Sequence, residues 1–168
     1  MTKGNQLQLF YIDSSYKTFA HSTANGLSYS VETQTVSSKD IGRNPLTEST
    51  GSSWSFTGTC LFTVTTANVA LGMAKSGEAY TFAFAQINEN WAPGLSSVNV
   101  DSSTAAWTPG SAFIQYGNGI VTDFSITAND GENATCDLTI TGSGPLSDSA
   151  PSTVKSWGSN NTPAQTEE

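Results

Sequence analysis

Apolar and polar residues alternate with a period of two in two segments of the chain, residues 27–34 and 54–64. The first segment sets Leu27, Tyr29 and Val31 against Ser28, Ser30, Glu32 and Gln34. The second sets Trp54, Phe56, Cys60, Phe62 and Val64 against Ser55, Thr57, Thr59 and Thr63. Because successive side chains of a strand point to opposite faces of a sheet, the pattern predicts two half-buried β-strands.

The segment between these two strands, residues 37–53, is polar and much longer than a hairpin connection needs to be. Hairpin loops usually contain about two to five residues, and structureless connections longer than about 12–15 residues in a compact domain are usually functional or disordered. We therefore interpret residues 37–53 as an arm that contacts another molecule.

Shorter patterns predict two further hairpins. An opening hairpin is predicted over residues 6–12 and 16–20, because the residues between them favour a turn. A closing hairpin is predicted over residues 119–128 and 134–141. Its connection contains an Asp-Gly pair, and these residues tolerate the positive φ angles of a hairpin turn. The side chains expected to point inward from the closing hairpin are Phe124, Ile126, Ala128, Cys136, Leu138 and Ile140.

A helix is expected over residues 67–75, with Thr66 as its N-cap and Gly77 as its end. Gly72 costs about 1 kcal/mol relative to alanine in a helix, so this helix should depend on packing against a sheet. The next segment, residues 78–87, carries bulky aromatics on even positions and small residues on odd ones. This pattern indicates a strand whose second face also lies close to another surface.

The chain contains 168 residues, which suits one domain, and we assign that domain to residues 1–146. Residues 88–110 show only a weak strand pattern at 98–100, and residues 147–168 are expected to form a flexible tail, either free or ordered by a partner. The start of the chain has no secretory pattern, and no apolar run predicts a membrane span or a membrane partner. The two cysteines, Cys60 and Cys136, can form a disulfide only if their strands are neighbours.

The formal net charge is −8, and only 12% of the residues are charged. Groove-reading of nucleic acid is disfavoured, since it requires clustered Lys and Arg. His21 is the only histidine, and no catalytic triad, phosphate loop, dinucleotide fingerprint or metal-ligand spacing accompanies it. We therefore expect a protein that is not an enzyme and has no catalytic, cofactor-binding or metal-binding residues, and hence no cofactor.

Two alternative interpretations depend on acidic residues. Asp123, Asp137 and Glu32 lie on polar strand faces, where solvated charge is ordinary, although two acids across a groove would suit glycoside hydrolysis. The acidic turn at residues 130–132 resembles a hairpin turn more than a calcium loop.

The polar strand faces fit either a solvent-facing sheet or the wall of a lumen. Trp91, Trp107 and Trp157 fit either small hydrophobic clusters or anchors in a neighbouring molecule.

The order of these motifs resembles the major tail proteins, which are the tail tube proteins of long-tailed bacteriophages. Residues 27–40 are similar to the first long strand and the Ser-Lys-Asp start of the arm in that family, and residues 53–57 are similar to its returning strand. Residues 71–84 resemble the family's helix and following strand, and residues 120–146 resemble its final hairpin. The likeness spans most of residues 6–146.

The resemblance implies a mainly β fold, an antiparallel β-sandwich or barrel with one short flanking α-helix at about residues 67–75 and a long inter-strand loop. It further implies a structural virion protein that forms hexameric rings, which stack into a tube for DNA ejection. The residues that would face the lumen are Glu32, Ser30, Gln34, Thr57 and Thr59. The arm residues that would contact an adjacent subunit are Ser38, Lys39, Asp40, Arg43 and Glu48.

The partners implied by the resemblance are other copies of the chain, the tape measure protein, the tail terminator, distal tail or baseplate proteins, and DNA in transient passage. The implied location is the virion tail, assembled in the host cytoplasm. Two other classes remain open: another virion structural or decoration β-sandwich, and a carbohydrate-binding or glycan-cleaving β-sandwich.

Overall fold

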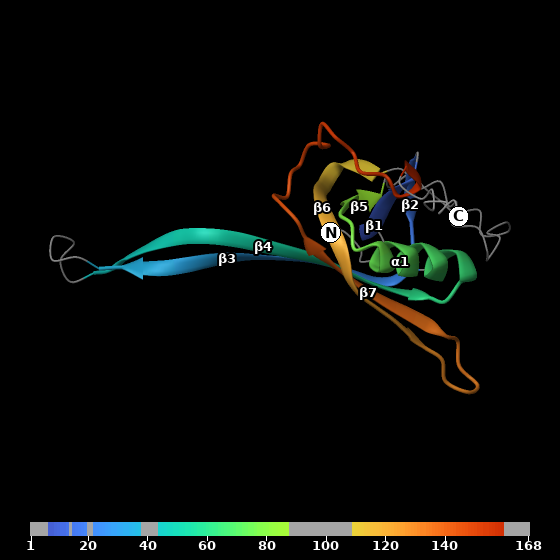
Figure 1. Cartoon of the computed structure of the whole chain (residues 1–168). Coiled ribbons are helices and arrows are strands. Elements are labelled where there is room, and N and C mark those ends of the chain that lie inside the picture. The colour runs from blue at the N-terminus through green and yellow to red at the C-terminus, as the bar shows by residue number, and fades with distance from the viewer. Residues whose placement is uncertain (1–6, 14, 20–21, 38–43, 88–108, 160–168) are drawn as a thin grey trace, which may run out of the picture.

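The computed structural model describes residues 7–13, 15–19, 22–37, 44–87 and 109–159 (Figure 1). These ranges contain strands β1 (Leu7–Asp13), β2 (Ser15–Thr18), β3 (Ser22–Val36), β4 (Leu46–Leu61), β5 (Tyr80–Ile87), β6 (Pro109–Thr127) and β7 (Thr135–Gly142), helix α1 (Val64–Ser76) and the short 3₁₀-helix η2 (Trp157–Ser159). The weak strand expected at residues 98–100, together with His21, Trp91 and Trp107, lies outside the described residues.

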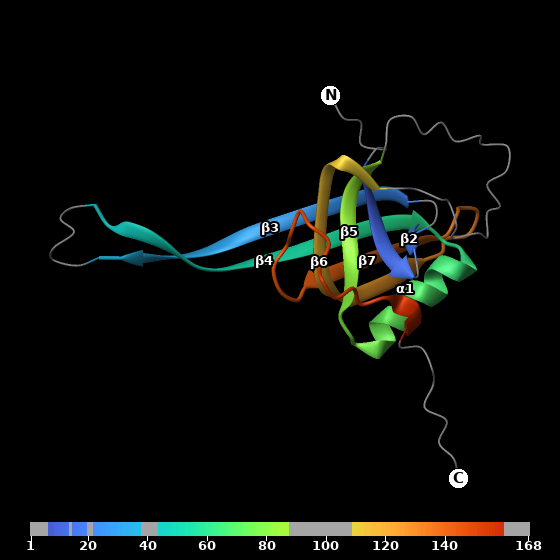
Figure 2. The same ribbon diagram turned by 90° about the horizontal axis from the view of Figure 1, so that it is seen from above.

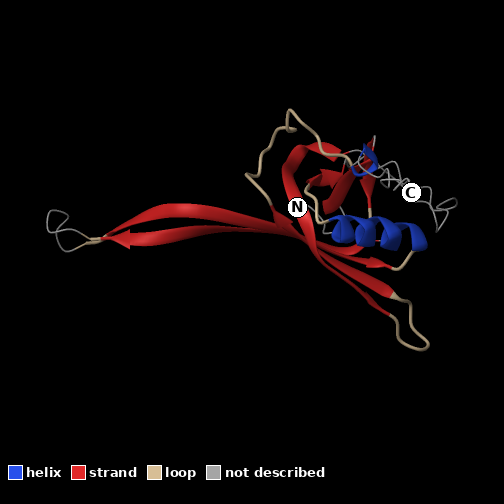
Figure 3. Cartoon of the chain, viewed as in Figure 1, coloured by secondary structure: helices blue, strands red, loops and turns tan. Residues whose placement is uncertain are grey.

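The described strands form one antiparallel sheet in the order β2-β1-β5-β6-β7-β4-β3. Strand β6 links the two halves of this sheet, because its first part pairs with β5 and its second part with β7, the change occurring at Gly119. The sheet folds over at this strand, so that β1 and β5 cross above β3, β4 and β7 (Figures 2 and 3). The expected mainly β, sandwich-like fold with a single flanking helix is therefore confirmed for the described chain.

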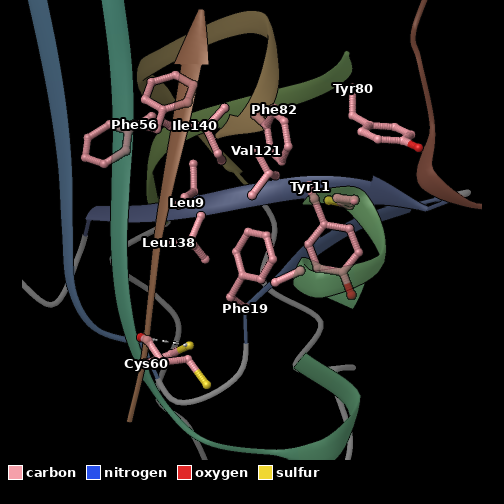
Figure 4. Packing of buried hydrophobic residues seen from close by; sticks show 14 of the residues in the cluster. Leu9, Tyr11, Phe19, Phe56, Cys60, Tyr80, Phe82, Val121, Leu138 and Ile140 are labelled. Carbon is pink, nitrogen blue, oxygen red and sulfur yellow. Dashed lines mark hydrogen bonds between the residues drawn. The ribbon is translucent and has the colours of Figure 1, made fainter. Parts of the chain in front are cut away.

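The hydrophobic core lies between the two halves of the folded sheet. Leu9 of β1, Phe82 of β5, Phe56 of β4 and Ile140 of β7 are fully or almost fully buried in one cluster (Figure 4). A second, smaller cluster on the other side of β5 contains Phe10, Ala83, Ala85 and Ile87. Both faces of β5 are thus covered, as its alternation of large and small residues predicts.

Trp54 occupies the point where β3 and β4 leave the body of the domain. Its indole Nε1 donates a hydrogen bond to the carbonyl oxygen of Gly144 at 2.7 Å. Three glycines make room for the ring, because a Cβ atom at Gly117 or Gly142 would lie 2.3 Å from the indole and one at Gly119 would lie 3.4 Å from it. Strands β4, β6 and β7 therefore meet around one aromatic side chain.

Helix α1 begins earlier than expected. Its N-cap is Thr63, whose hydroxyl accepts a hydrogen bond from the backbone N–H of Thr66 at 3.2 Å, so Thr66 is a residue of the first turn and not the cap. The helix ends at Gly77 with φ of 64°, as expected. Gly72 is explained by packing, since a Cβ atom there would lie 2.5 Å from the indole of Trp157. Within the described ranges, no helix has the length and apolar character needed to cross a lipid bilayer.

Residues 147–159, which we call the C-terminal strap, pack on the body of the domain. Ser147 and Tyr116 exchange two backbone hydrogen bonds of 2.7 and 2.9 Å. Further along, Lys155 makes two hydrogen bonds of 2.9 Å with Thr81, one through its carbonyl oxygen and one through its backbone N–H. Trp157 meets the ring of Tyr80 edge-on at 5.5 Å. The expectation of a flexible tail is therefore wrong for these residues, while residues 160–168 lie outside the described part.

Cys60 and Cys136 face each other on the neighbouring strands β4 and β7, and both are buried, free thiols. The Sγ atom of Cys60 lies 3.8 Å from the carbonyl oxygen of Cys136. Burial, and to a smaller extent the nearby Cys136, raise the pKa of Cys60 to about 12. Burial also raises the pKa of Cys136. Both side chains consequently remain protonated at neutral pH, where they act as small apolar residues of the core.

Candidate assembly interface

Strands β3 and β4 continue beyond the body as a long two-stranded ribbon (Figure 1). Strand β7 accompanies β4 only over Ser55–Leu61, so the outer part of β4 has β3 as its only described neighbour. We call this outer ribbon, residues 28–36 and 46–54, the arm. Its length is roughly 30 Å at about 3.3 Å per residue.

The arm differs from the structureless loop expected at residues 37–53. Residues 46–53 belong to β4, so that the connection between the strands is confined to residues 37–45. Glu48 lies in β4 opposite Gln34 and is exposed. The other four residues expected to contact a neighbour, Ser38, Lys39, Asp40 and Arg43, lie outside the described residues. A strand was missed here because the alternation of residues 46–53 contains polar residues on both faces.

The arm exposes apolar side chains on the face that is buried elsewhere in the sheet. Leu27 and Trp54 pack in or against the core, whereas Tyr29 is 54% exposed and Val31 is 50% exposed. The apolar face that the alternation predicts to be buried is therefore exposed over this outer part of β3. A two-stranded ribbon is only marginally stable in water. Its apolar face would gain stability from contact with another molecule.

The opposite face of β3, β4, β7 and β6 is continuous and rich in hydroxyl groups. The cross-strand register and the alternation along each strand place the following residues on this hydroxyl face: Ser28, Ser30, Glu32, Gln34, Ser53, Ser55, Thr57, Thr59, Asp123, Ser125, Thr127, Asp137, Thr139 and Thr141. It includes all five residues expected to face a lumen, Ser30, Glu32, Gln34, Thr57 and Thr59. Sequence patterns detected the polar positions of each hairpin, but they contain no signal that β4 and β7 are neighbours.

Hydrogen bonds link neighbouring strands across the hydroxyl face. The Thr59 hydroxyl donates to the Asp137 carboxylate at 2.6 Å, which joins β4 to β7. The hydroxyls of Thr122, in β6, and Thr141, in β7, lie 2.9 Å apart. These bonds satisfy polar groups within the chain and hold them in place. Side chains of β4, β6 and β7 on the hydroxyl face are therefore held by bonds between strands.

The charge on these four strands has one sign. Strands β3, β4, β6 and β7 carry four acidic residues, Glu32, Glu48, Asp123 and Asp137, and contain no Lys or Arg. The basic residues of the described ranges lie elsewhere: Lys17 in β2, Lys75 in α1 and Lys155 in the strap. No group of three or more His, Cys, Asp or Glu residues within those ranges could hold a metal ion.

The hydroxyl face ends at two strand edges that pair with no described strand. Strand β3 pairs on one side only, with β4. The second part of β6, residues 120–127, pairs on one side with β7, and its pairing with β5 has already ended at Gly119. Exposed edges of this kind are ready to pair with a strand of another chain. They lie on opposite sides of the same four-stranded surface.

The fold, though not the sequence, matches known proteins. No protein-family model and no curated protein sequence matches the chain. A chain in the tail of an empty gene transfer agent (GTA) particle, resolved with C6 symmetry, superposes with a TM-score of 0.65 at 20% identity, covering 89% of this chain and 100% of the other. A chain in the virion of the native GTA particle gives 0.63 at 21% identity, with coverages of 89% and 100%.

A third similar structure is the SPP1 tail tube, with a TM-score of 0.57 at 12% identity over 86% of this chain and 77% of the other. The likeness to tail tube proteins expected from the sequence motifs is thus confirmed at the level of the fold.

Proposed function

We propose that this chain is the structural subunit of a phage-type tail tube, in which six copies form a ring and the rings stack around a channel for DNA. The observation that carries the proposal is the hydroxyl face, a continuous and mostly polar surface without Lys or Arg that is bounded by two unpaired strand edges. The shared fold with a chain of a C6-symmetric GTA tail supports this assembly and its six-fold symmetry.

The two free edges provide a mechanism for closing a ring. The edge of β3 in one copy pairs with residues 120–127 of β6 in the next, so that the sheets join into a barrel. This pairing removes both exposed edges of every subunit, which otherwise favour aggregation. The hydroxyl faces then line the lumen, while the sandwich cores and α1 lie outside. Four of the five residues expected to face the lumen from sequence, Ser30, Glu32, Thr57 and Thr59, would do so, whereas Gln34 pairs with Glu48 in the outer part of the arm.

The chemistry of the hydroxyl face suits a channel for DNA. Each Lys or Arg that contacts a phosphate adds attraction through counterion release, and the attraction acts on any sequence. A wall with Glu32, Asp123 and Asp137 and no cation offers no such contacts. DNA can therefore slide along it without being held.

The arm supplies contacts between subunits or between stacked rings. Its exposed apolar side chains, Tyr29 and Val31, need a covering surface, and a second copy is the partner that the tube provides. The proposed contact residues are Glu48 of the arm and, in the connection between its two strands, Ser38, Lys39, Asp40 and Arg43. In this setting the chain has a structural role and no catalytic one, and it resides in the virion tail after assembly in the host cytoplasm. Tape measure, terminator and distal tail or baseplate proteins are its further proposed partners.

Electron microscopy of the concentrated, purified protein tests the proposal. We expect rings and tubes with a central channel in negative stain, because the free edges pair once the concentration is sufficient. Persistent monomers at high concentration would contradict it. Monomers that also bind oligosaccharides would favour the carbohydrate-binding alternative, and closed shells or isolated oligomers without a channel would favour another virion role.

The substitution Glu32→Lys tests the lumen assignment. Wild-type tubes should not retain short duplex DNA, whereas Glu32→Lys tubes should retain it in a salt-dependent manner, because each ring then carries lysines in the channel. The measurement is co-sedimentation of DNA with assembled tubes at two salt concentrations. Asp148→Lys, which makes the same change of charge at an exposed position of the strap, is the matched control. Equal DNA retention by the two variants would show that Glu32 does not face the channel.

A further inference from the structure

The arm consists of two parts that face different directions. The pairing of β3 with β4 shifts register between Glu32 and Thr33, which marks a β-bulge. A bulge bends a strand and increases its twist. Figure 2 shows the ribbon turning over toward its far end. We call residues 33–36 and 46–49, beyond the bulge, the arm tip.

The arm tip presents an apolar and an acidic side chain together. Leu46 is 54% exposed, and Glu48 is also exposed. The two residues lie two positions apart in β4, on the same side of the strand, and are therefore about 6.7 Å apart along it. Their cross-strand partners, Val36 and Gln34, are uncharged.

The outer side of α1 presents a matching pair. Leu71 is 37% exposed, and Lys75 is exposed one helical turn later. Residues four apart lie on the same side of a helix, with a rise of about 6 Å between them. Val64, which is also exposed, extends this apolar side toward the start of the helix. We call Val64, Leu71 and Lys75 the α1 stripe.

We propose that the arm tip of one copy docks on the α1 stripe of a second copy, with Leu46 against Leu71 and Glu48 paired with Lys75. The inference rests on the proposed tube function and names the surface that receives the arm. A contact between two different surfaces of identical chains is heterologous and can repeat from copy to copy without closing on itself. This property is the one that stacking requires.

Other basic residues of the described ranges fit the arm tip less well. Lys17 already pairs with Asp13, with 2.8 Å between Nζ and Oδ2. Lys155 is held by the strap next to Val154, so its apolar neighbour is adjacent in sequence and not one helical turn away. Among the basic residues that the structure describes, Lys75 alone combines a positive charge with an apolar neighbour at the spacing of Leu46 and Glu48.

Charge reversal and its compensation test the docking. Glu48→Lys and Lys75→Glu should each raise the protein concentration needed for tube formation about tenfold or more, because each places like charges together. The double variant Glu48→Lys/Lys75→Glu should restore that concentration to within about threefold of the wild type, since it re-forms the pair in reverse. Sedimentation and negative-stain microscopy across a dilution series provide the measurement. Lys155→Glu, alone and with Glu48→Lys, is the matched control and should show no compensation.

The outcomes separate this inference from the proposed function. Wild-type protein that never forms tubes would overturn both. Wild-type tubes combined with a double variant no better than the worse single variant would overturn the docking alone. The same conclusion would follow if both single variants assembled like the wild type, or if Lys155→Glu compensated for Glu48→Lys. A thermal melt of each monomeric variant shows whether the domain stays folded. Equal melting temperatures for the single and double variants would support a contact between copies, because the charge changes then leave the fold itself unaffected.

Discussion

Replacing Trp54 with alanine is expected to lower the free energy of unfolding by about 3–5 kcal/mol, the usual cost of removing a large buried aromatic side chain. The indole is almost fully buried, lies 4.8 Å from the ring of Phe56 between centroids, and donates a hydrogen bond to Gly144. Its loss would leave a cavity bordered by β4, β6 and β7. Chemical denaturation followed by circular dichroism measures the effect.

The glycines around Trp54 provide the control. Gly142→Ala in the wild type should cost about 1–3 kcal/mol, because overpacking a core is destabilising and the new Cβ would overlap the indole. In a Trp54→Ala background the same substitution should cost much less, since the indole is gone. An equal cost in both backgrounds would show that the ring does not occupy the space beside Gly142.

Shortening the arm at its bulge should abolish tubes while the domain remains folded. Glu32 and Gly51 are direct cross-strand partners, so residues 33–50 can be replaced by Asn-Gly, a two-residue turn that suits a hairpin. The removed residues that the structure describes are exposed, apart from the partly buried Val36. We therefore expect a change of less than about 1 kcal/mol in the free energy of unfolding, as for surface changes away from the core. Microscopy should show no stacked rings.

The shortened protein keeps β3 as far as Glu32 and all of the β6 edge. Single rings should therefore still form at high concentration, which would separate ring closure from stacking. If this variant formed tubes as long as those of the wild type, the arm would have no role in stacking. A shortened chain that failed to fold would show that the outer ribbon belongs to the core.

The sequence predicted best those features that depend on neighbouring residues. Alternation identified β3, β4 and the closing hairpin, and the large and small residues of β5 correctly indicated that both of its faces are covered. The end of α1 at Gly77 was also predictable, because a residue with φ of 64° strongly favours glycine.

The missed features depend on contacts between distant segments. Trp157 in a Ser- and Gly-rich segment gave no sign that it packs over Gly72, yet this contact holds the strap to the body and explains a glycine inside a helix. Ile126 was expected inward from its alternation but is 48% exposed, because the far end of the β6–β7 hairpin extends past the core. The extent of the hydroxyl face likewise depended on β4 lying beside β7.

The packing of Trp54 at the base of the arm also affects the thermodynamics of association. A flexible tether loses conformational entropy when a partner captures it, at about 1–2 kcal/mol for each residue whose backbone becomes fixed. A ribbon anchored by a buried indole and paired along its length is already preorganised. The chain has therefore lost much of this conformational entropy during folding, before any partner binds. Weak individual contacts at the end of such a ribbon can then suffice for polymerisation. Because each contact is weak, polymerisation remains reversible until the subunits are correctly arranged.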